Sequence, residues 1–371
     1  MKKIVILATY VGIVNRGAET FVIELVKKLK ERYDIEVYAL GRNDEITNNI
    51  IVVESKLPFW FGLHKFLYES FYPYKAVCER VFYIIPTILE QYYFTRTVYE
   101  RYLKNRRDID LMFPNNGHYG AKLSNFFREK LNIPFIYTGH GGIGEGEIKI
   151  LSEKPDLYVA LNNTHASWAK KFHLRVMKIS NGVDVDKFAP KIGVSESLIK
   201  TVLCVGAFVR LKRQKLLIDA IEKLNNVNLI LLGEGEMMND LKNYGEQRLK
   251  DRFEIKSVKY NEIQTYYDKC DLFSLPTKEE PFGIVYLEAM SMNKPIVAPD
   301  DESRREIIGE AGLYCDVEDS LAYSKTITKA LHMSWGNIPR DRAISKFDWN
   351  IIAAKYIESI DDLIDLNREL E

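Results

Sequence analysis

Short runs of apolar residues, each about as long as a buried β-strand, recur along the chain. The first series consists of KIVILAT (3–9), IEVYAL (35–40), IDLMFP (109–114), PFIYT (134–138), DLYVAL (156–161) and VMKIS (176–180). Amphipathic segments such as AETFVIELVKKLKERY (18–33) lie between several of these runs. Continuous apolar strands that alternate with amphipathic helices are typical of βαβ units, so the pattern predicts a parallel sheet.

The pattern then restarts, which predicts a second domain of the same class. Its strands are TVLCVG (201–206), VNLILLG (227–233), FEIKSV (253–258), DLFSLPT (271–277) and PIVAP (295–299). We therefore expect an α/β protein with two Rossmann-like, doubly wound domains that face each other across a cleft. The expected domains are residues 1–180 and 199–349. The aperiodic segment 181–198 links them, and a last helix, about 350–371, packs back on the first domain.

Composition narrows the class of protein without identifying a ligand. The 371 residues are 46% apolar and 28% charged, which is typical of a globular protein with two cores. Basic and acidic residues number 52 each, so a nucleic-acid partner is not expected. Four cysteines lie far apart without a CxxC pair, which argues against a zinc site or disulfide framework. With no signal peptide or apolar span visible, we expect a cytoplasmic protein.

The stretch KEEPFGIVYLEAM, residues 278–290, holds two glutamates on either side of a Pro-Phe-Gly turn. Glu280 should lie in a loop after a strand, and Glu288 about one turn inside the following helix. The backbone N–H groups of Phe282, Gly283 and Ile284 would start that helix and attract phosphate. Carboxylates beside such donors suit sugar hydroxyls and a ribose diol, so the stretch predicts a sugar-nucleotide site.

This stretch also resembles the E-x7-E motif of retaining glycosyltransferases with the GT-B fold, of the family-four (group 1) type. The other matching segments follow the family's order: RGAET (16–20), FIYTGHGG (135–142), ISNGVDVDKFAP (179–190), LLGEGE (231–236), CDLFSLPTKEEPFGIVYLEAMSMNKPIVAPD (270–300) and FDWNIIAAKYIESI (347–360). The resemblance implies an enzyme that moves a sugar from a nucleotide-diphosphate donor to an acceptor hydroxyl with retention of configuration. It implies no catalytic metal and no cofactor beyond the donor.

The resemblance also implies roles for individual residues. Glu280 and His140 would face the sugar, and Lys212 would neutralise the diphosphate; these three are the expected catalytic set. The donor-binding set would consist of Glu288 at the ribose together with Lys212, Arg210, Gly17, Phe282, Gly283, Ile284 and Val258. Ala207 stands where the family usually has arginine, so Arg210 or Arg213 would supply the second positive charge. ESRRE (302–306) replaces the common Gly-Gly pair, and no donor contact is expected there.

Three further motifs offer other chemistry. DID (108–110) and DVD (184–186) fit the D-x-D pattern of metal-dependent transferases, but the first opens a strand and the second lies in the linker, so neither is expected to hold a metal. GHGGIG (139–144) fits a dinucleotide fingerprint, although the residues after Gly144 are charged and poorly helical. The alternatives are thus an epimerase or phosphorylase of the same fold, a nicotinamide-dependent oxidoreductase, and a non-catalytic sugar-binding subunit.

Residues 57–102 hold 15 aromatic side chains in 46 positions, against 12% for the whole chain. One interpretation is an acceptor groove or a face that rests peripherally on the inner membrane surface. The favoured interpretation is a helical insertion that packs its rings into the first domain's core. The expected partners are the sugar-nucleotide donor and a sugar, lipid-linked or small-molecule acceptor.

Overall fold

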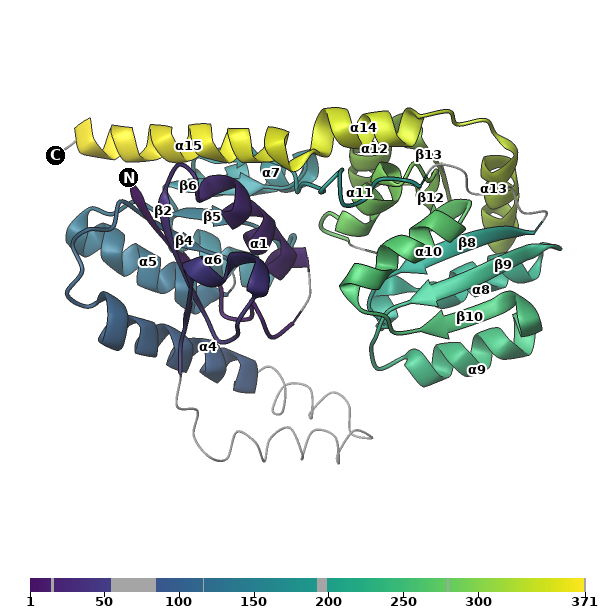
Figure 1. Ribbon diagram of the computed structural model, residues 1–371, viewed down its shortest axis with the longest axis horizontal. Helices are drawn as coiled ribbons and strands as arrows, with labels where there is room; N and C mark the ends of the chain where they lie inside the picture. The colour runs from purple at the N-terminus through teal and green to yellow at the C-terminus, as the bar shows by residue number, and fades with distance from the viewer. Residues whose placement is uncertain (15–16, 55–84, 116, 192–198, 279, 370–371) are drawn as a thin grey trace. The chain divides into compact units, whose positions relative to one another are not determined.

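The computed structural model describes residues 1–371 except 15–16, 55–84, 116, 192–198, 279 and 370–371 (Figure 1). The chain forms two compact units. Unit 1 consists of residues 1–160, 168–177 and 353–371, and unit 2 of residues 161–167 and 178–352. Residues 161–167, which the sequence places in the first domain, thus group with the second. The reason is visible in their contacts, because Asn162 and Asn163 hydrogen-bond Pro281 and Glu306.

Unit 1 contains parallel strands in the order β3-β2-β1-β4, followed by β5-β6-β7. A parallel bridge from Met112 to Phe135 joins β4 to the start of β5. The strand bounds are β1 Lys3–Leu7, β2 Asp34–Ala39, β3 Ile50–Val52, β4 Leu111–Pro114, β5 Ile136–Thr138, β6 Leu157–Ala160 and β7 Val176–Lys178. The central strands β1, β4 and β6 are buried almost throughout, as their uninterrupted apolar sequences predict.

The helices of unit 1 follow its strands in sequence. They are α1 Gly17–Leu29, α4 Ile85–Val98, α5 His118–Leu131 and α6 Glu145–Leu151. Within α7 Asn163–Ala169 the chain passes from unit 2 back to unit 1. A π-helical turn, η3 Tyr99–Leu103, continues α4. Phe94 and Val98 of α4 belong to the unit 1 core, which agrees with the packing interpretation for this part of the aromatic segment. The expectations for residues 57–84 lie outside the described residues.

The last helix, α15 Trp349–Glu369, belongs to unit 1 from Ala353 onward. Tyr356 is fully buried there, and its hydroxyl lies 3.0 Å from the Thr138 hydroxyl. Asp361 accepts hydrogen bonds from Lys2 and Arg32, so ion pairs at the helix surface accompany the buried contact. Two structural units therefore share one continuous helix.

Unit 2 is a single parallel sheet in the order β10-β9-β8-β11-β12-β13, the strand order of a Rossmann fold. The strands are β8 Lys200–Val205, β9 Val227–Leu232, β10 Phe253–Lys256, β11 Leu272–Ser274, β12 Ile296–Pro299 and β13 Gly312–Cys315. The helices are α8 Gln214–Glu222, α9 Met238–Leu249, α10 Ile263–Lys269, α11 Ile284–Ser291, α12 Glu302–Ile308, α13 Ser320–His332 and α14 Ile338–Phe347. The predicted pair of doubly wound α/β domains is confirmed.

The segment 181–198 is expected to be a linker, and its first residues, NGV (181–183), are firmly packed. Asn181 and Val183 are buried, and Val183 pairs with Asp348 through a parallel bridge. Gly182 lies directly under the Trp349 ring, where an added Cβ would come within 2.6 Å of the ring carbons. A close approach of this kind requires glycine, so NGVD is a packing motif as well as a connection.

Candidate functional site

The two loops that carry Glu280 and Lys212 meet in unit 2. Lys212 closes a short 3₁₀ turn, η5 Arg210–Lys212, and Glu280 lies between β11 and α11. The Lys212 Nζ donates a hydrogen bond to Glu280 Oε2, and the two side chains are only 21% and 13% exposed. The Lys278 N–H donates to the Leu211 carbonyl at 3.0 Å, which ties the loop backbones together. A basic and an acidic group are thus held side by side in a largely desolvated position.

The start of α11 lies beside this pair. Gly283 precedes the helix with φ +81° and ψ +73°, and no side chain of the described residues caps the helix. The first N–H groups of a helix have no partner within it, so a phosphate or sugar oxygen can bind there. The Phe282 side chain is buried with its ring 6.2 Å from that of Phe347, so only its backbone is available to a ligand.

Glu288 is the fifth residue of α11 and only 3% exposed. Its Oε1 accepts a hydrogen bond from the Tyr260 hydroxyl and its Oε2 one from Tyr267, both at 3.0 Å. Burial raises the pKa of Glu288, while the Tyr267 and Tyr260 hydroxyls and the charge of Lys187 act in the opposite direction. The Lys187 ammonium also lies 4.4 Å from the Tyr260 ring centre. Neither tyrosine was predicted from the sequence, since a tyrosine in a helical segment has no motif of its own.

The two arginines proposed as the second positive charge differ in their contacts. Arg213 donates to the Pro276 carbonyl at 2.9 Å and to Glu318 at 2.7 Å, so it holds the loop after β11. The Arg210 side chain is exposed and has no ion pair or hydrogen bond to the described residues. Arg210 is therefore the arginine that a diphosphate could recruit. Val258, the remaining expected donor residue, follows β10 and packs its side chain against the unit 2 core.

Asn162 and Arg304, which were not predicted from the sequence, donate hydrogen bonds to the backbone of the Glu280 loop. Asn162 is buried, and its amide donates to the Pro281 carbonyl at 2.8 Å. Arg304 is also buried, and its guanidinium donates to the Thr277 carbonyl at 3.2 Å. Arg304 lies in α12, which Asp301 caps through the Arg304 N–H at 3.0 Å. The stretch ESRRE thus forms a helix that supports the loop.

In unit 1, His140 and the start of α1 are close together. Gly17 is the first residue of α1 and is exposed, and Phe21 lies one turn further on. The Phe21 ring meets the His140 ring edge-on, with centroids 4.6 Å apart. The loop of His140 follows β5, and its Gly139 N–H donates to the Val159 carbonyl of β6 at 2.9 Å. The predicted His140 and Gly17 therefore come from neighbouring loops at one end of the unit 1 sheet.

A buried carboxylate, Glu147, anchors the His140 loop and was missed in the sequence. Its Oε1 accepts the Gly141 N–H at 3.1 Å, and the side chain is 3% exposed. Burial raises the pKa of Glu147 to about 7, offset only by the Gly141 hydrogen bond. The nearby Tyr137 and Tyr158 have pKa values raised by burial and by this carboxylate. Glu147 lies in α6, so the residues after GHGGIG are helical, which corrects the prediction that they are poorly so.

The two D-x-D matches are engaged in structural contacts. Asp108 pairs with Arg106 and Lys3, and Asp110 accepts the Lys3 N–H at 2.7 Å and a hydrogen bond from Arg368. Asp184 accepts the N–H groups of the two residues after Val185. Among the described residues, no group of three or more His, Cys, Asp or Glu side chains could hold a metal ion.

The two Rossmann-type units, with a charged loop pair at a helix start in unit 2, agree with the GT-B fold expected from the sequence. Comparison of the sequence assigns residues 188–346 to the family Glycosyl transferases group 1. The chain is 29% identical over 197 residues to the uncharacterized glycosyltransferase MJ1178 of Methanocaldococcus jannaschii, a match that covers 50% of this chain and 53% of that protein. It is 28% identical over 196 residues to the phosphatidyl-myo-inositol mannosyltransferase of Mycobacterium leprae, covering 48% and 51%. The matches span about half the length of these relatives.

Solved structures resemble the whole chain. Anabaena Alr3699/HepE, in complex with UDP and glucose, superimposes with a TM-score of 0.74 at 18% identity and covers 98% of this chain and 100% of that one. Sucrose-phosphate synthase from Thermosynechococcus elongatus gives a TM-score of 0.73 at 16% identity, with 99% and 100% covered. These likenesses establish the GT-B fold of both units. None of the described helices is long and apolar enough to cross a membrane.

Proposed function

We propose that the protein transfers a sugar from a nucleotide-diphosphate sugar to an acceptor hydroxyl, with retention of configuration. The observation that carries the proposal is the pairing of Lys212 with Glu280 beside the uncapped start of α11, with Glu288 buried in the same helix. Group 1 membership of residues 188–346 supports it, as does the presence of UDP-glucose in the similar HepE structure.

In this proposal the diphosphate replaces Glu280 as the partner of Lys212. The N–H groups at the start of α11 and the exposed Arg210 add further positive potential, so charge that develops on the leaving group is stabilised. Glu280, once released from Lys212, is free to accept hydrogen bonds from the sugar. His140 is the unit 1 residue that the family resemblance assigns to the same sugar.

Glu288 takes the ribose in the same proposal. The hydroxyls of Tyr260 and Tyr267 each use one lone pair of the carboxylate and fix its orientation. A carboxylate has about four acceptor positions, so two remain for a ribose diol. The two tyrosines therefore preorganise an acceptor that would otherwise need to be ordered on binding.

We further propose that the reaction needs no divalent ion. Asp108, Asp110 and Asp184 already have cations or N–H groups as partners, and Lys212 with Arg210 offers the diphosphate positive charge without a metal. Activity should survive EDTA. A strict requirement for Mg²⁺ or Mn²⁺, restored when the ion is added back, would contradict this part of the proposal.

The function is tested in two steps. A panel of sugar nucleotides is screened by thermal shift, because a ligand that binds the folded state raises its apparent stability with concentration. The donor that binds is then incubated with sugar and lipid-linked acceptors, and release of the nucleoside diphosphate is measured. The anomeric configuration of the product, read by NMR, tests retention. A donor that binds but is never turned over with any acceptor would favour a non-catalytic sugar-binding protein.

A further inference from the structure

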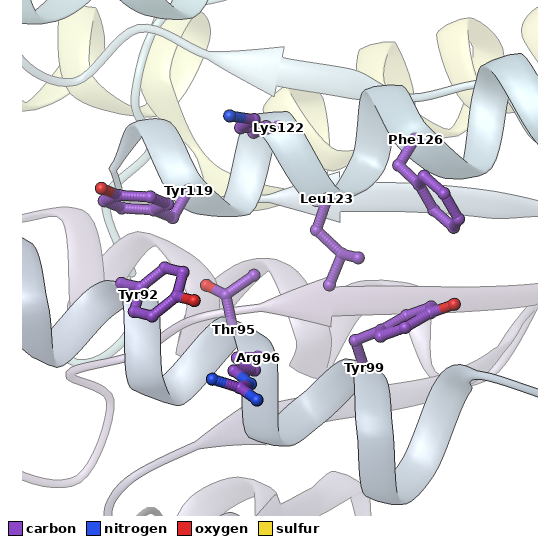
Figure 2. Close-up of a pocket in the computed structure, with 8 residues that line it drawn as sticks. All are labelled: Tyr92, Thr95, Arg96, Tyr99, Tyr119, Lys122, Leu123 and Phe126. Carbon is purple, nitrogen blue, oxygen red and sulfur yellow. The ribbon is translucent and has the colours of Figure 1, made fainter. Parts of the chain in front are cut away.

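A groove between α4 and α5 of unit 1 contains none of the residues assigned above to the donor or the sugar. Its volume is about 260 Å³, and it is lined by Tyr92, Thr95, Arg96, Tyr99, Tyr119, Lys122, Leu123 and Phe126 (Figure 2). Four of these lie on α4 and the adjoining η3, and four on α5, in both cases with spacings of three, four and seven residues. Such spacings place each set on one face of its helix, so the two helices turn one stripe each toward the groove.

Aromatic pairs join the two helices at the ends of the groove. The rings of Tyr92 and Tyr119 lie edge to face with centroids 5.5 Å apart, and those of Tyr99 and Phe126 have the same separation. Between the pairs, the nearly buried Thr95 and Leu123 line the groove. Tyr92 and Phe126 remain 38% and 39% exposed, which is high for large apolar rings. The interior is therefore an apolar slot open to solvent.

The charge around this slot has one sign. Arg96 and Lys122 are both exposed and have no ion pair with any residue in the described ranges, and no acidic residue lines the groove. Both side chains carry long apolar stems that can lie along the aromatic walls while their charges stay in water. An apolar slot whose rim holds two cations without an acidic partner among the described residues is complementary to an anion attached to a hydrocarbon chain.

We propose that this groove binds an anionic phospholipid of a bilayer, with part of one acyl chain between α4 and α5 and the phosphate at Arg96 and Lys122. Its volume is below the range of roughly 300–1,000 Å³ that is usual for pockets enclosing a whole small molecule, so it fits a length of chain. The proposal does not depend on the transferase reaction.

Vesicle sedimentation tests the charge half of the proposal. The full-length protein should sediment with vesicles of phosphatidylcholine mixed with phosphatidylglycerol, and far less with phosphatidylcholine alone. Arg96→Glu/Lys122→Glu should weaken binding to the mixed vesicles by roughly tenfold or more, since each basic residue near an anionic surface contributes measurably to affinity. Lys130→Glu/Lys149→Glu makes the same change in net charge on exposed residues outside the groove and should bind as the unmodified protein does. If both double variants lost vesicle binding equally, the binding would depend on net charge alone, and the proposed site at Arg96 and Lys122 would be wrong.

Thr95→Phe tests the acyl chain, because it fills the slot and keeps both cations. Binding to the mixed vesicles should fall by roughly fivefold or more, as expected when about 1 kcal/mol of apolar burial is lost. Circular dichroism and thermal melting show whether the variant is folded. A folded Thr95→Phe protein that binds normally would exclude chain insertion, and no sedimentation of the unmodified protein would refute the whole proposal. Light scattering that showed a dimer dissociated by the same variants would instead assign the groove to a second copy of the chain.

Discussion

The two units differ in the groups that contact their buried carboxylates. In unit 2, Glu280 pairs with Lys212, and Glu288 accepts hydrogen bonds from two tyrosine hydroxyls. In unit 1, Glu147 is as buried as Glu288, and burial raises its pKa to about 7 although the hydrogen bond from the Gly141 N–H acts in the opposite direction. In the proposed function a donor replaces Glu280 as the partner of Lys212. Glu147 instead holds the loop of His140, and burial raises its pKa to about 7.

The largest effect is expected for Lys212, the cation that pairs with Glu280. Lys212→Ala should lower turnover by roughly 100-fold or more, the scale of losing one preorganised group that stabilises developing charge. Steady-state kinetics at saturating donor measure it. Lys215→Ala is the matched control, because Lys215 lies three residues further on, pairs with Asp240 and should leave turnover almost unchanged. Similar kinetics for the two variants would remove Lys212 from the site.

Glu147→Gln should make the protein more stable at pH 8 and leave its stability nearly unchanged at pH 4. Because the folded-state pKa is raised, the carboxyl's stabilising contribution is complete below its ordinary value of 4.5 and is lost as the pH rises through about 7. A shift of this size corresponds to about 3 kcal/mol. Gln is isosteric with the protonated acid and can still accept the Gly141 N–H. Denaturant unfolding at both pH values measures the difference.

Glu145→Gln is the control for this prediction, because Glu145 begins the same helix and is exposed. It should behave as the unmodified protein does at both pH values. If Glu147→Gln were destabilised at pH 8, the carboxylate would have to be ionised and satisfied there, and the contrast between the two units would disappear.

The two glutamates of unit 2 should shift nucleoside diphosphate affinity in opposite directions. Glu288→Gln removes a charged acceptor for the ribose and should weaken binding by roughly tenfold, since such hydrogen bonds contribute about 1.5–3 kcal/mol. Glu280→Gln frees Lys212 from its partner and should strengthen the same binding by up to about fivefold, the value of a partly exposed ion pair. Turnover should still fall in Glu280→Gln because the sugar loses an acceptor.

Calorimetric titration with the nucleoside diphosphate and with the intact donor separates these roles. Weaker nucleoside diphosphate binding in both variants would show that Glu280 also contacts the nucleotide. No change in either would place the two residues outside the donor site.

The sequence predicted the fold well because both units rely on uninterrupted apolar strands. It missed β3 and β13, which are only three and four residues long and lie at sheet edges, where partial exposure weakens the apolar signal. The positions of Glu280 before the helix and Glu288 within it could be predicted because motif and turn coincide around Gly283. Glu147, Tyr260 and Asn162 were not found, since their roles depend on which distant backbone or carboxylate they reach. The local sequence EGEIKI does not indicate that Glu147 is buried without a neighbouring cation.

The smallest effect concerns the turn that sets the position of Glu280. Gly283 has φ +81°, and an added Cβ would come within 2.7 Å of the Tyr286 ring and 3.2 Å of Glu280 Cγ. The ring is fixed, because Tyr286 is fully buried and donates to the Leu275 carbonyl at 3.0 Å. Gly283→Ala should therefore cost about 1–2 kcal/mol for the left-handed backbone and in addition displace the Glu280 loop.

Gly336→Ala separates these two costs, since Gly336 has φ +53° and open space where a Cβ would lie. Both variants should lose similar stability through the backbone, measured by denaturant unfolding. Only Gly283→Ala should also lose donor affinity and turnover, because only there does the methyl group press on the side chain that pairs with Lys212. If the two variants were equally active, the position of Glu280 would not depend on the turn. The Lys212–Glu280 pair would then owe its geometry to the other contacts of the loop, from Leu211 to Lys278, from Asn162 to Pro281 and from Arg304 to Thr277.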